Sequence, residues 1–285
     1  MSKQAPVNEE SQQRGVILVI VLWTVAMMTV VIAALSTNVR TSASLAGTET
    51  RRLSTEMLLQ GGIDVAAATL IASGDNIRTV SDGHATAIDL GNGNIAEMKI
   101  RDAAGLIDLN RAEEALLAGI IAHATESEDT GKAMAQQIVQ WRSGEVGDAD
   151  SQPAAFISVA QLYNIKDMDP KVVAGFLPFV GLYSKEGRIN LTAAPDEVIA
   201  SIPEIKPAEI DMLIAARNGN DWDNNNIKSL LDDYDDYVTL DPTNVFMVDL
   251  ELVQTSGLIL GTHLKATIMI DKSADIPFHV ISRSW

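Results

Sequence analysis

The sequence has no cysteine and comparatively few basic side chains. Without cysteine, thiol catalysis, disulfide frameworks and Cys-ligated zinc sites are excluded. The 21 Lys and Arg residues are outnumbered by 38 Asp and Glu residues, which gives a formal charge of −17. Because a nucleic-acid backbone is bound through a cationic surface, this balance argues against DNA or RNA as a partner. The length of 285 residues allows one elaborate domain or two modest ones.

Charge is completely absent from one long stretch near the N-terminus. The mean hydropathy of +0.11 is high for so charged a chain, so the apolar residues are concentrated in part of it. No charged residue lies between Arg14 and Arg40, and residues 16–35 read VILVIVLWTVAMMTVVIAAL. At a rise of 1.5 Å per residue, such a run matches a hydrocarbon core of roughly 30 Å and predicts a transmembrane helix. The acidic excess lies after this segment.

Three interpretations of the N-terminal segment are open. A secretory signal peptide would have a shorter apolar region followed by a small-residue cleavage site. A plain signal anchor would account for the length and the apolar character. The third interpretation rests on the junction itself, where a short polar stretch ends in Gln13, Arg14 and Gly15 and the apolar run starts abruptly at Val16.

At this junction the sequence resembles the type IV pilin and pseudopilin superfamily, whose leader is removed directly after a glycine by a prepilin peptidase. The resemblance implies cleavage between Gly15 and Val16 and methylation of the new N-terminus. Most members carry a glutamate five residues into the mature chain, and this sequence has Ile20 there. That departure is the pattern of one class, the K-type minor pseudopilin of the type II secretion system.

Apolar residues after the anchor predict that the helix continues. They recur at spacings near three and four residues, as on an amphipathic helix, up to a Ser-Gly-Asp-Asn cluster at residues 73–76 that is expected to end it. The recurring positions are Leu45, Leu53, Met57, Leu58, Gly61, Val65, Ala68 and Leu70. Residues 16–73 therefore predict one long helix, first transmembrane and then a stem.

Strand patterns occur before and after a helical block, which predicts an α+β fold. The segments on either side of Gly91-Asn92-Gly93-Asn94 alternate in polarity, as in a β-hairpin. Alternating or β-branched runs return after Asp241-Pro242. We expect a leader at 1–15, the long helix at 16–73, first strands at 74–104, an inserted helical subdomain at 105–240 and closing strands at 241–285.

The inserted segment contains an internal repeat. Residues 104–120 resemble residues 186–202 at an offset of 82, and each copy leads into a second helix. We expect an all-helical insert of two helix-hairpin-helix-like units, at about 104–180 and 186–240. Such hairpins grip phosphate through a glycine-containing turn, but the turn at 202–207 has no glycine and gains a carboxylate. The second unit is thus expected to keep the scaffold without binding DNA.

No catalytic motif is present, and we expect that the protein is not an enzyme. The four histidines, His84, His123, His263 and His279, are scattered along the chain. Nucleophile-elbow, phosphate-loop and His-Glu-x-x-His motifs are absent from the sequence.

One acidic segment approximates a calcium loop. Asp221, Asp223, Asn225 and Asp232 occupy positions 1, 3, 5 and 12 of such a loop. Asp232 is shorter than the usual bidentate glutamate, and a solvated acidic loop is the alternative interpretation. The resemblance to K-type pseudopilins implies Ca²⁺ binding somewhere in the soluble head, without placing it at these residues.

The resemblance to K-type minor pseudopilins extends along nearly the whole chain. It implies a pilin-like antiparallel sheet on the stem helix and a subunit that caps the pseudopilus tip, helps to initiate its assembly and so supports protein export. The implied partners are the I-type and J-type minor pseudopilins, the prepilin peptidase and the inner membrane, with a cytoplasmic N-terminus and a periplasmic head. Two alternatives are a signal-anchored periplasmic binding module and a helix-hairpin-helix DNA receptor of a competence system.

Overall fold

The structure is a computed structural model of the chain. It describes the backbone of residues 9–144, 155–166, 168–254 and 261–285, and within these ranges the side chains of all residues except 9–16, 34–44 and 75. The chain divides into two compact units, Met1–Glu56 and Met57–Trp285.

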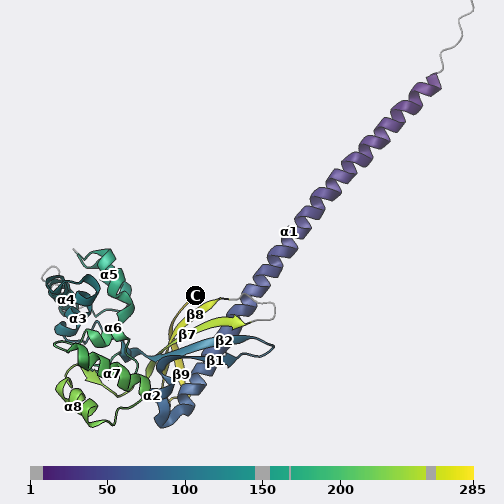
Figure 1. The fold of residues 1–285 in the computed structure, drawn as a ribbon. Helices are drawn as coiled ribbons and strands as arrows, with labels where there is room; N and C mark the ends of the chain where they lie inside the picture. Colours follow the sequence, from purple (N-terminus) through teal and green to yellow (C-terminus); the bar gives the residue numbers. More distant parts are fainter. Residues whose placement is uncertain (1–8, 145–154, 167, 255–260) are drawn as a thin grey trace, which may run out of the picture. The chain divides into compact units, whose positions relative to one another are not determined.

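Helix α1 (Glu9–Ser73) is 65 residues long and provides the described part of the first unit (Figure 1). Every side chain from Ile17 to Trp23 is at least 55% exposed, so no face of this stretch is buried in the chain itself. Counted over the described residues alone, no helix has an apolar stretch long enough to span a membrane. The helix ends at Ser73 and Gly74 has a φ of +53°, which confirms the predicted stop.

Five strands of the second unit form one antiparallel sheet in the order β1-β2-β7-β8-β9 (Figure 1). Their bounds are β1 (Asp82–Asp89), β2 (Ile95–Asp102), β7 (Val245–Gln254), β8 (His263–Ile270) and β9 (Phe278–Ser284). β1 and β2 form the predicted hairpin, closed where the Leu90 amide donates to the Asn94 carbonyl at 2.9 Å. The α+β class is therefore confirmed. β2 and β7 are neighbours, so the long segment between them leaves and rejoins the sheet at adjacent strands.

The C-terminal part of α1 packs on one face of this sheet. Leu59 and Ile63 of α1 are fully buried in one cluster with Phe246 and Leu250 of β7. The helix lies so close that a Cβ added at Gly62 would be 2.9 Å from Cδ1 of Leu250. Each fully buried aliphatic side chain contributes roughly 1.5–3 kcal/mol. This packing gives the sheet one buried face.

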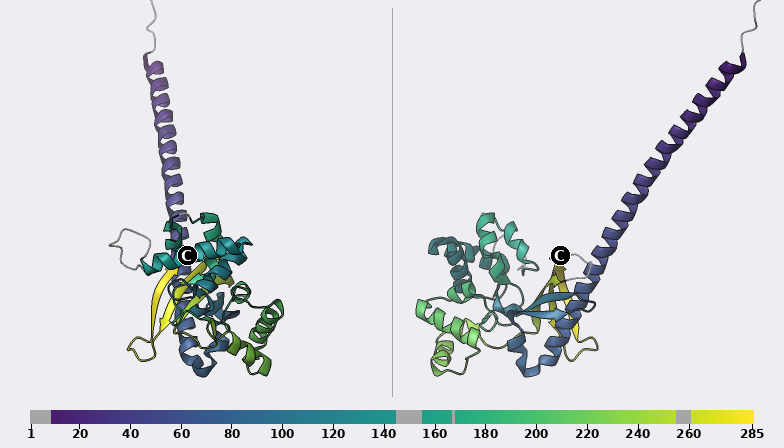
Figure 2. Two further views of the ribbon diagram at one scale, coloured as in Figure 1. Left: turned by 90° about the vertical axis from the view of Figure 1, so that its left-hand side faces the viewer. Right: turned by 45° about the vertical axis from the view of Figure 1, so that its right-hand side comes forward.

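The segment between β2 and β7 is mainly helical, and its helices gather beside one end of the sheet (Figure 2). Its α-helices are α3 (Glu114–Thr125), α4 (Glu128–Ser143), α5 (Pro170–Phe176), α6 (Asp196–Ala200), α7 (Pro207–Gly219) and α8 (Asn225–Asp233). A further short helix, α2 (Ile77–Val80), precedes β1. The 3₁₀ helices are η1 (Gly74–Asn76), η2 (Ala103–Gly105), η3 (Val159–Asn164) and η4 (Leu177–Phe179).

The expectation of an all-helical insert is wrong in one respect. Two short parallel strand pairs lie within it: β3 (Ile107–Asp108) with β4 (Val180–Gly181), and β5 (Ile189–Asn190) with β6 (Val238–Thr239). Two-residue strands are too short to show the period of two by which strands are recognised. Each pair closes one repeat, because it joins the residues before the first helix to those after the last.

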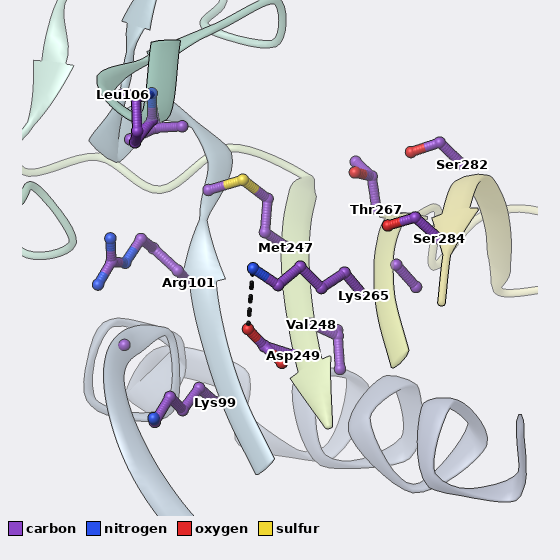
Figure 3. A pocket seen from close by; sticks show the side chains of 13 residues that line it. Lys99, Arg101, Leu106, Met247, Val248, Asp249, Lys265, Thr267, Ser282 and Ser284 are labelled. Atoms are coloured by element: carbon purple, nitrogen blue, oxygen red, sulfur yellow. Dashed lines mark ion pairs between the residues drawn. The ribbon is translucent and has the colours of Figure 1, made fainter. Parts of the chain in front are cut away.

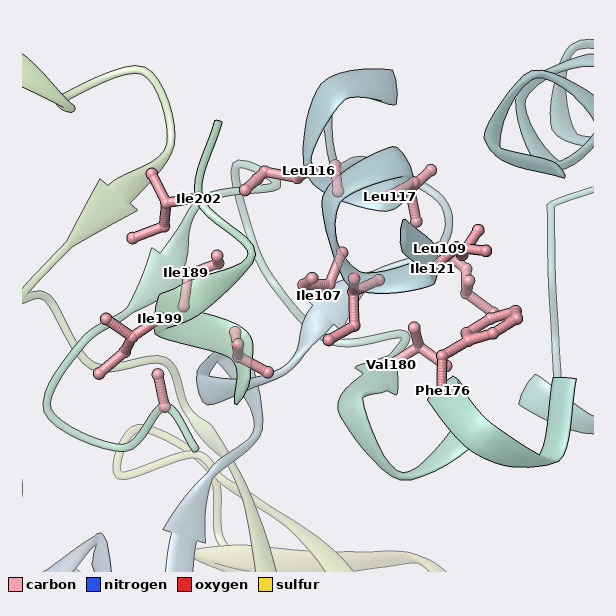
Figure 4. Packing of buried hydrophobic residues seen from close by; sticks show 14 of the residues in the cluster. Ile107, Leu109, Leu116, Leu117, Ile121, Phe176, Val180, Ile189, Ile199 and Ile202 are labelled. Carbon is pink, nitrogen blue, oxygen red and sulfur yellow. The ribbon is translucent and has the colours of Figure 1, made fainter. Parts of the chain in front are cut away.

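The two repeats share one hydrophobic core. Ile107 and Leu109 of the first repeat and Ile189 of the second are fully buried in the same cluster, together with Phe176 and Ile199 (Figure 4). The copies differ in their first helix, since α3 has 12 residues and α6 has five. The repeat is therefore one packed body rather than two independent modules.

The backbones of the two repeats lie close together at Gly119 of α3. A Cβ built there would be 2.1 Å from the carbonyl oxygen of Ser201, which is backbone of the second repeat. We predict that Gly119→Ala lowers the free energy of unfolding by ~1–3 kcal/mol, because the two backbones must move apart. The matched control is Gly61→Ala in α1, where a Cβ would meet nothing within 4 Å. Since alanine favours helix over glycine, the control should keep or raise stability by up to ~1 kcal/mol. Urea unfolding of both variants makes the comparison, and equal midpoints would contradict the close contact.

Candidate functional site

In each repeat, an arginine near the end of the second helix donates hydrogen bonds to carbonyls of the segment before the first helix. Arg142 of α4 donates from Nη1 to the Leu109 carbonyl at 3.0 Å and from Nη2 to the Ala112 carbonyl at 2.8 Å. Arg217 of α7 donates from Nη1 to the Ala194 carbonyl. Ala112 and Ala194 are related by the offset of 82 residues, so the contact is repeated with the sequence. Both guanidinium groups are used inside the fold.

In the hairpin of the second repeat, the carboxylate of Glu209 accepts the hydrogen bonds of Lys206 and Tyr234. The Lys206 amide donates to Glu209 Oε2 at 2.9 Å, and Lys206 Nζ donates to Oε1 at 2.8 Å. The Tyr234 hydroxyl also donates to Oε2, at 2.8 Å. These bonds, led by the Lys206 side chain, lower the pKa of Glu209 to about 2. Burial and the contact with Glu209 raise the pKa of Tyr234 to about 12.

The depressed pKa of Glu209 predicts an acid-dependent loss of stability. A carboxylate with a lowered pKa contributes stability above its unfolded pKa, near 4.3, and loses that contribution as the pH falls through its folded value. The stability difference between the wild type and Glu209→Gln should thus be constant above about pH 5 and disappear between about pH 4 and pH 2. NMR titration of the Glu209 carboxyl measures the pKa directly, and Tyr234→Phe should raise it. A wild-type value near the ordinary glutamate pKa would contradict the hairpin geometry.

Asp102, at the end of β2, is completely buried and accepts four hydrogen bonds. Its Oδ1 accepts from the Ala104 amide and the Thr243 hydroxyl, both at 2.8 Å. Its Oδ2 accepts from the Thr243 amide at 2.6 Å and from Asn190 Nδ2 at 3.2 Å. Burial raises the pKa of Asp102, and the four donors oppose that effect. Through these hydrogen bonds, the carboxylate connects the end of β2 with Asn190 of the second repeat and with Thr243, which precedes β7.

We predict that Asp102→Asn lowers the free energy of unfolding by ~1–3 kcal/mol. The amide replaces one acceptor oxygen by a donor, so two of the four buried donors lose their partner. This loss outweighs the relief of removing a buried charge. Asp241→Asn is the matched control, because its side chain is 85% exposed and its contact with Arg78 is 3.4 Å long. Urea unfolding midpoints compare the two, and a neutral Asp102→Asn would show that the network is dispensable.

The four residues of the expected calcium loop do not converge on one point. Helix α8 begins at Asn225, because the Asn224 side chain caps it by accepting from the Asn226 amide at 2.9 Å. Asn225 and Asp232 are therefore about 10 Å apart along one helix, too far to share an ion. Asp223 instead pairs with Lys228 at 3.2 Å. Among the described residues, no group of three or more histidine or acidic side chains is placed to hold a metal ion. In this structure the four residues do not assemble a calcium site, and Ca²⁺ binding in the head stays a prediction.

The other residues singled out in the sequence belong to several different helices and strands. His84 on β1 pairs with Asp82 at 3.0 Å, and His263 on β8 lies 3.5 Å from Glu251. His123 lies on α3 and His279 on β9. Ile20 is 56% exposed on α1. Gly15 and Val16, at the expected cleavage site, lie outside the residues whose side chains the structure describes.

A cavity of about 410 Å³ lies on the face of the sheet opposite α1 (Figure 3). Three basic side chains line it, Lys99, Arg101 and Lys265, with Asp249 as its one acidic lining residue among the described part of the chain. Lys99 and Arg101 leave β2 on the same side, and Lys265 extends across β7 toward Asp249, 3.6 Å away (Figure 3). We did not predict this cationic cavity, although the alternation of residues 95–101 already places Lys99 and Arg101 on one face.

No family model matches the chain, and no curated protein is similar to it in sequence. Among solved structures, the chain is similar to a chain in the crystal structure of the GspK-GspI-GspJ complex from the enterotoxigenic Escherichia coli type 2 secretion system. The two are 13% identical, the match covers 82% of this chain and 98% of that chain, and the TM-score is 0.46. A likeness of this degree carries no argument about what this chain does.

Proposed function

We propose that this protein is a K-type minor pseudopilin that caps the tip of a type II secretion pseudopilus. One observation carries the proposal: the helix that contains the Gly15–Val16 junction also packs its C-terminal part against an antiparallel sheet, and a duplicated helical segment is inserted between two neighbouring strands of that sheet. A stem helix packed on a sheet is the arrangement that the resemblance at the junction implies. The inserted repeat distinguishes the K type from smaller pseudopilins.

The N-terminal half of α1 is proposed to lie in the inner membrane until assembly, with the leader in the cytoplasm and the head in the periplasm. The uncharged run at residues 16–35 supports this placement, as do the exposed apolar side chains from Ile17 to Trp23, which cover all sides of the helix. Such a surface needs lipid or other helices around it. In the assembled filament, the same surface packs among the helices of neighbouring subunits.

Ile20 supports a position at the end of the filament. In this superfamily, the glutamate at that position is thought to neutralise the N-terminal ammonium of the next subunit. A terminal subunit has no such ammonium to meet, and an unpaired buried carboxylate would be strongly unfavourable. An isoleucine avoids that cost, and the bulk of the helical insert would block further subunits. The I-type and J-type minor pseudopilins are the proposed neighbours.

Processing by a prepilin peptidase tests the proposal. When the full chain is co-expressed with the peptidase, intact-mass spectrometry should show loss of residues 1–15 and one added methyl group at Val16. Gly15→Val should abolish both changes, because the peptidase recognises the glycine. Gly47→Val is the matched control, since that glycine lies further along α1 with nothing within 4 Å of an added Cβ. The control chain should be processed like the wild type.

The same experiment separates the proposal from its alternatives. A chain that keeps residues 1–15 while the peptidase processes a major pseudopilin in the same cells would reject the pseudopilin assignment. The processed chain should co-purify with I-type and J-type minor pseudopilins. A signal-anchored binding module would do neither, and a competence-type receptor would show salt-dependent DNA binding.

A further inference from the structure

The open face of the sheet carries its side chains in cross-strand rows. On β2, Ala96, Met98 and Ile100 are buried against α1, so the intervening side chains face the opposite side. The strand register places Lys99, Asp249, Lys265 and Ser284 in one row. The next row consists of Arg101, Met247, Thr267 and Ser282. These two rows form the floor of the 410 Å³ cavity.

The two rows differ in how their cations are neutralised. Lys99 pairs with Glu97 at 2.9 Å and Lys265 with Asp249 at 3.6 Å. In the second row, Arg101 faces Met247 directly and Thr267 beyond it, and neither has a negative charge. The Arg101 guanidinium makes no hydrogen bond or ion pair with any residue in the described part of the chain.

On β1, on the other side of Arg101, the carboxylate of Asp82 already interacts with His84. Asp82 of β1 is the register partner of Arg101, but its Oδ1 accepts from the His84 amide at 2.8 Å and its Oδ2 lies 3.0 Å from His84 Nδ1. A bulge between Asp82 and Ala85 shifts the register there and includes Gly83. A Cβ at Gly83 would be 2.9 Å from Arg101 Nε, so the glycine leaves room for the guanidinium above the strand.

Within the described part of the chain, Arg101 is therefore a half-buried cation whose guanidinium makes no direct ion pair, in a protein with an excess of acidic residues. Burial lowers the pKa of Arg101, and repulsion from Arg217 acts in the same direction, whereas Glu197 and Asp82 oppose it. The two lysine pairs nearby are exposed, and such pairs exchange partners at little cost. A ligand anion could draw on all three cations.

We propose that this cavity binds a carboxylate, with the Arg101 guanidinium as its principal partner. A planar guanidinium matches a carboxylate in two parallel hydrogen bonds. The volume lies within the range of ligand sites, and Met247, Leu106 and Pro178 supply an apolar wall for the stem of the ligand. Asp249 in the floor disfavours a doubly charged phosphate. The carboxylate would come from an acidic side chain of a peptide or from a free dicarboxylic acid. This proposal is independent of the proposed role as a minor pseudopilin.

Isothermal titration of the full chain in detergent micelles tests the proposal. The probes are the acetylated and amidated tripeptide Ala-Glu-Ala, the same tripeptide with Gln in place of Glu, and succinate. We expect at least one carboxylate probe to bind with a dissociation constant in the millimolar range or tighter, and the Gln tripeptide not to bind. Binding of the Glu tripeptide alone identifies peptide side chains as the source, and binding of succinate alone identifies free acids.

Arg101→Gln should weaken binding by at least about tenfold, because it removes a charge-assisted bidentate contact. Arg101→Lys should restore part of it. Lys228→Gln is the matched control: it removes a cation that pairs with Asp223 away from the cavity, and it should change affinity by less than about twofold. Because the Arg101 guanidinium makes no hydrogen bond or ion pair among the residues that the structure describes, Arg101→Gln should not lower the melting temperature. Equal affinity of wild type and Arg101→Gln, measurable binding of the Gln tripeptide as tight as that of the Glu tripeptide, or no binding of either carboxylate probe would overturn the proposal.

Discussion

The buried carboxylate of Asp102 is the contact on which the arrangement of the second unit depends. A carboxylate without exposure to water is stable only when donors surround it, and here the donors come from three separate segments. Ala104 follows β2, Asn190 belongs to the second repeat, and Thr243 precedes β7. The carboxylate has its full set of hydrogen bonds only when all three segments are in place around it. The carboxylate thus fixes where the helical segment leaves the sheet, how the second repeat lies against it and where the chain returns.

The features predicted correctly from the sequence are those determined locally. The β1–β2 hairpin follows from a turn of Gly and Asn residues flanked by alternating segments, and the end of α1 follows from Ser73 and Gly74. The repeat was visible because both copies keep apolar residues at equivalent positions. The structure adds a shared contact that similarity alone did not reveal, the bond from Arg142 to Ala112 and its counterpart from Arg217 to Ala194.

The features that the sequence did not reveal depend on partners distant in the chain or on competition between local patterns. The strand pairs β3–β4 and β5–β6 are only two residues long, so their periodicity is invisible. The spacing of Asp221, Asp223 and Asn225 suggested a calcium loop, but Asn224 is also a good helix N-cap, and the helix formed instead. Arg101 lies in a recognisable strand, yet the absence of a direct ion pair to it among the described residues follows from the register with β7 and from the contact of Asp82 with His84.

The meeting of Asp102 and Thr243 has a consequence for how this protein could change in evolution. The two residues are 141 positions apart, and the amide of one donates to the carboxylate of the other at 2.6 Å. A segment whose ends are joined in this way can grow with little effect on the sheet, because each doubling of a flexible connection adds only about 0.6 kcal/mol of closure entropy. Duplication inside that segment leaves the pairing of β2 with β7 unaltered. The sequences of the sheet and the stem helix can therefore be retained in evolution while the sequence and length of the inserted helical segment change.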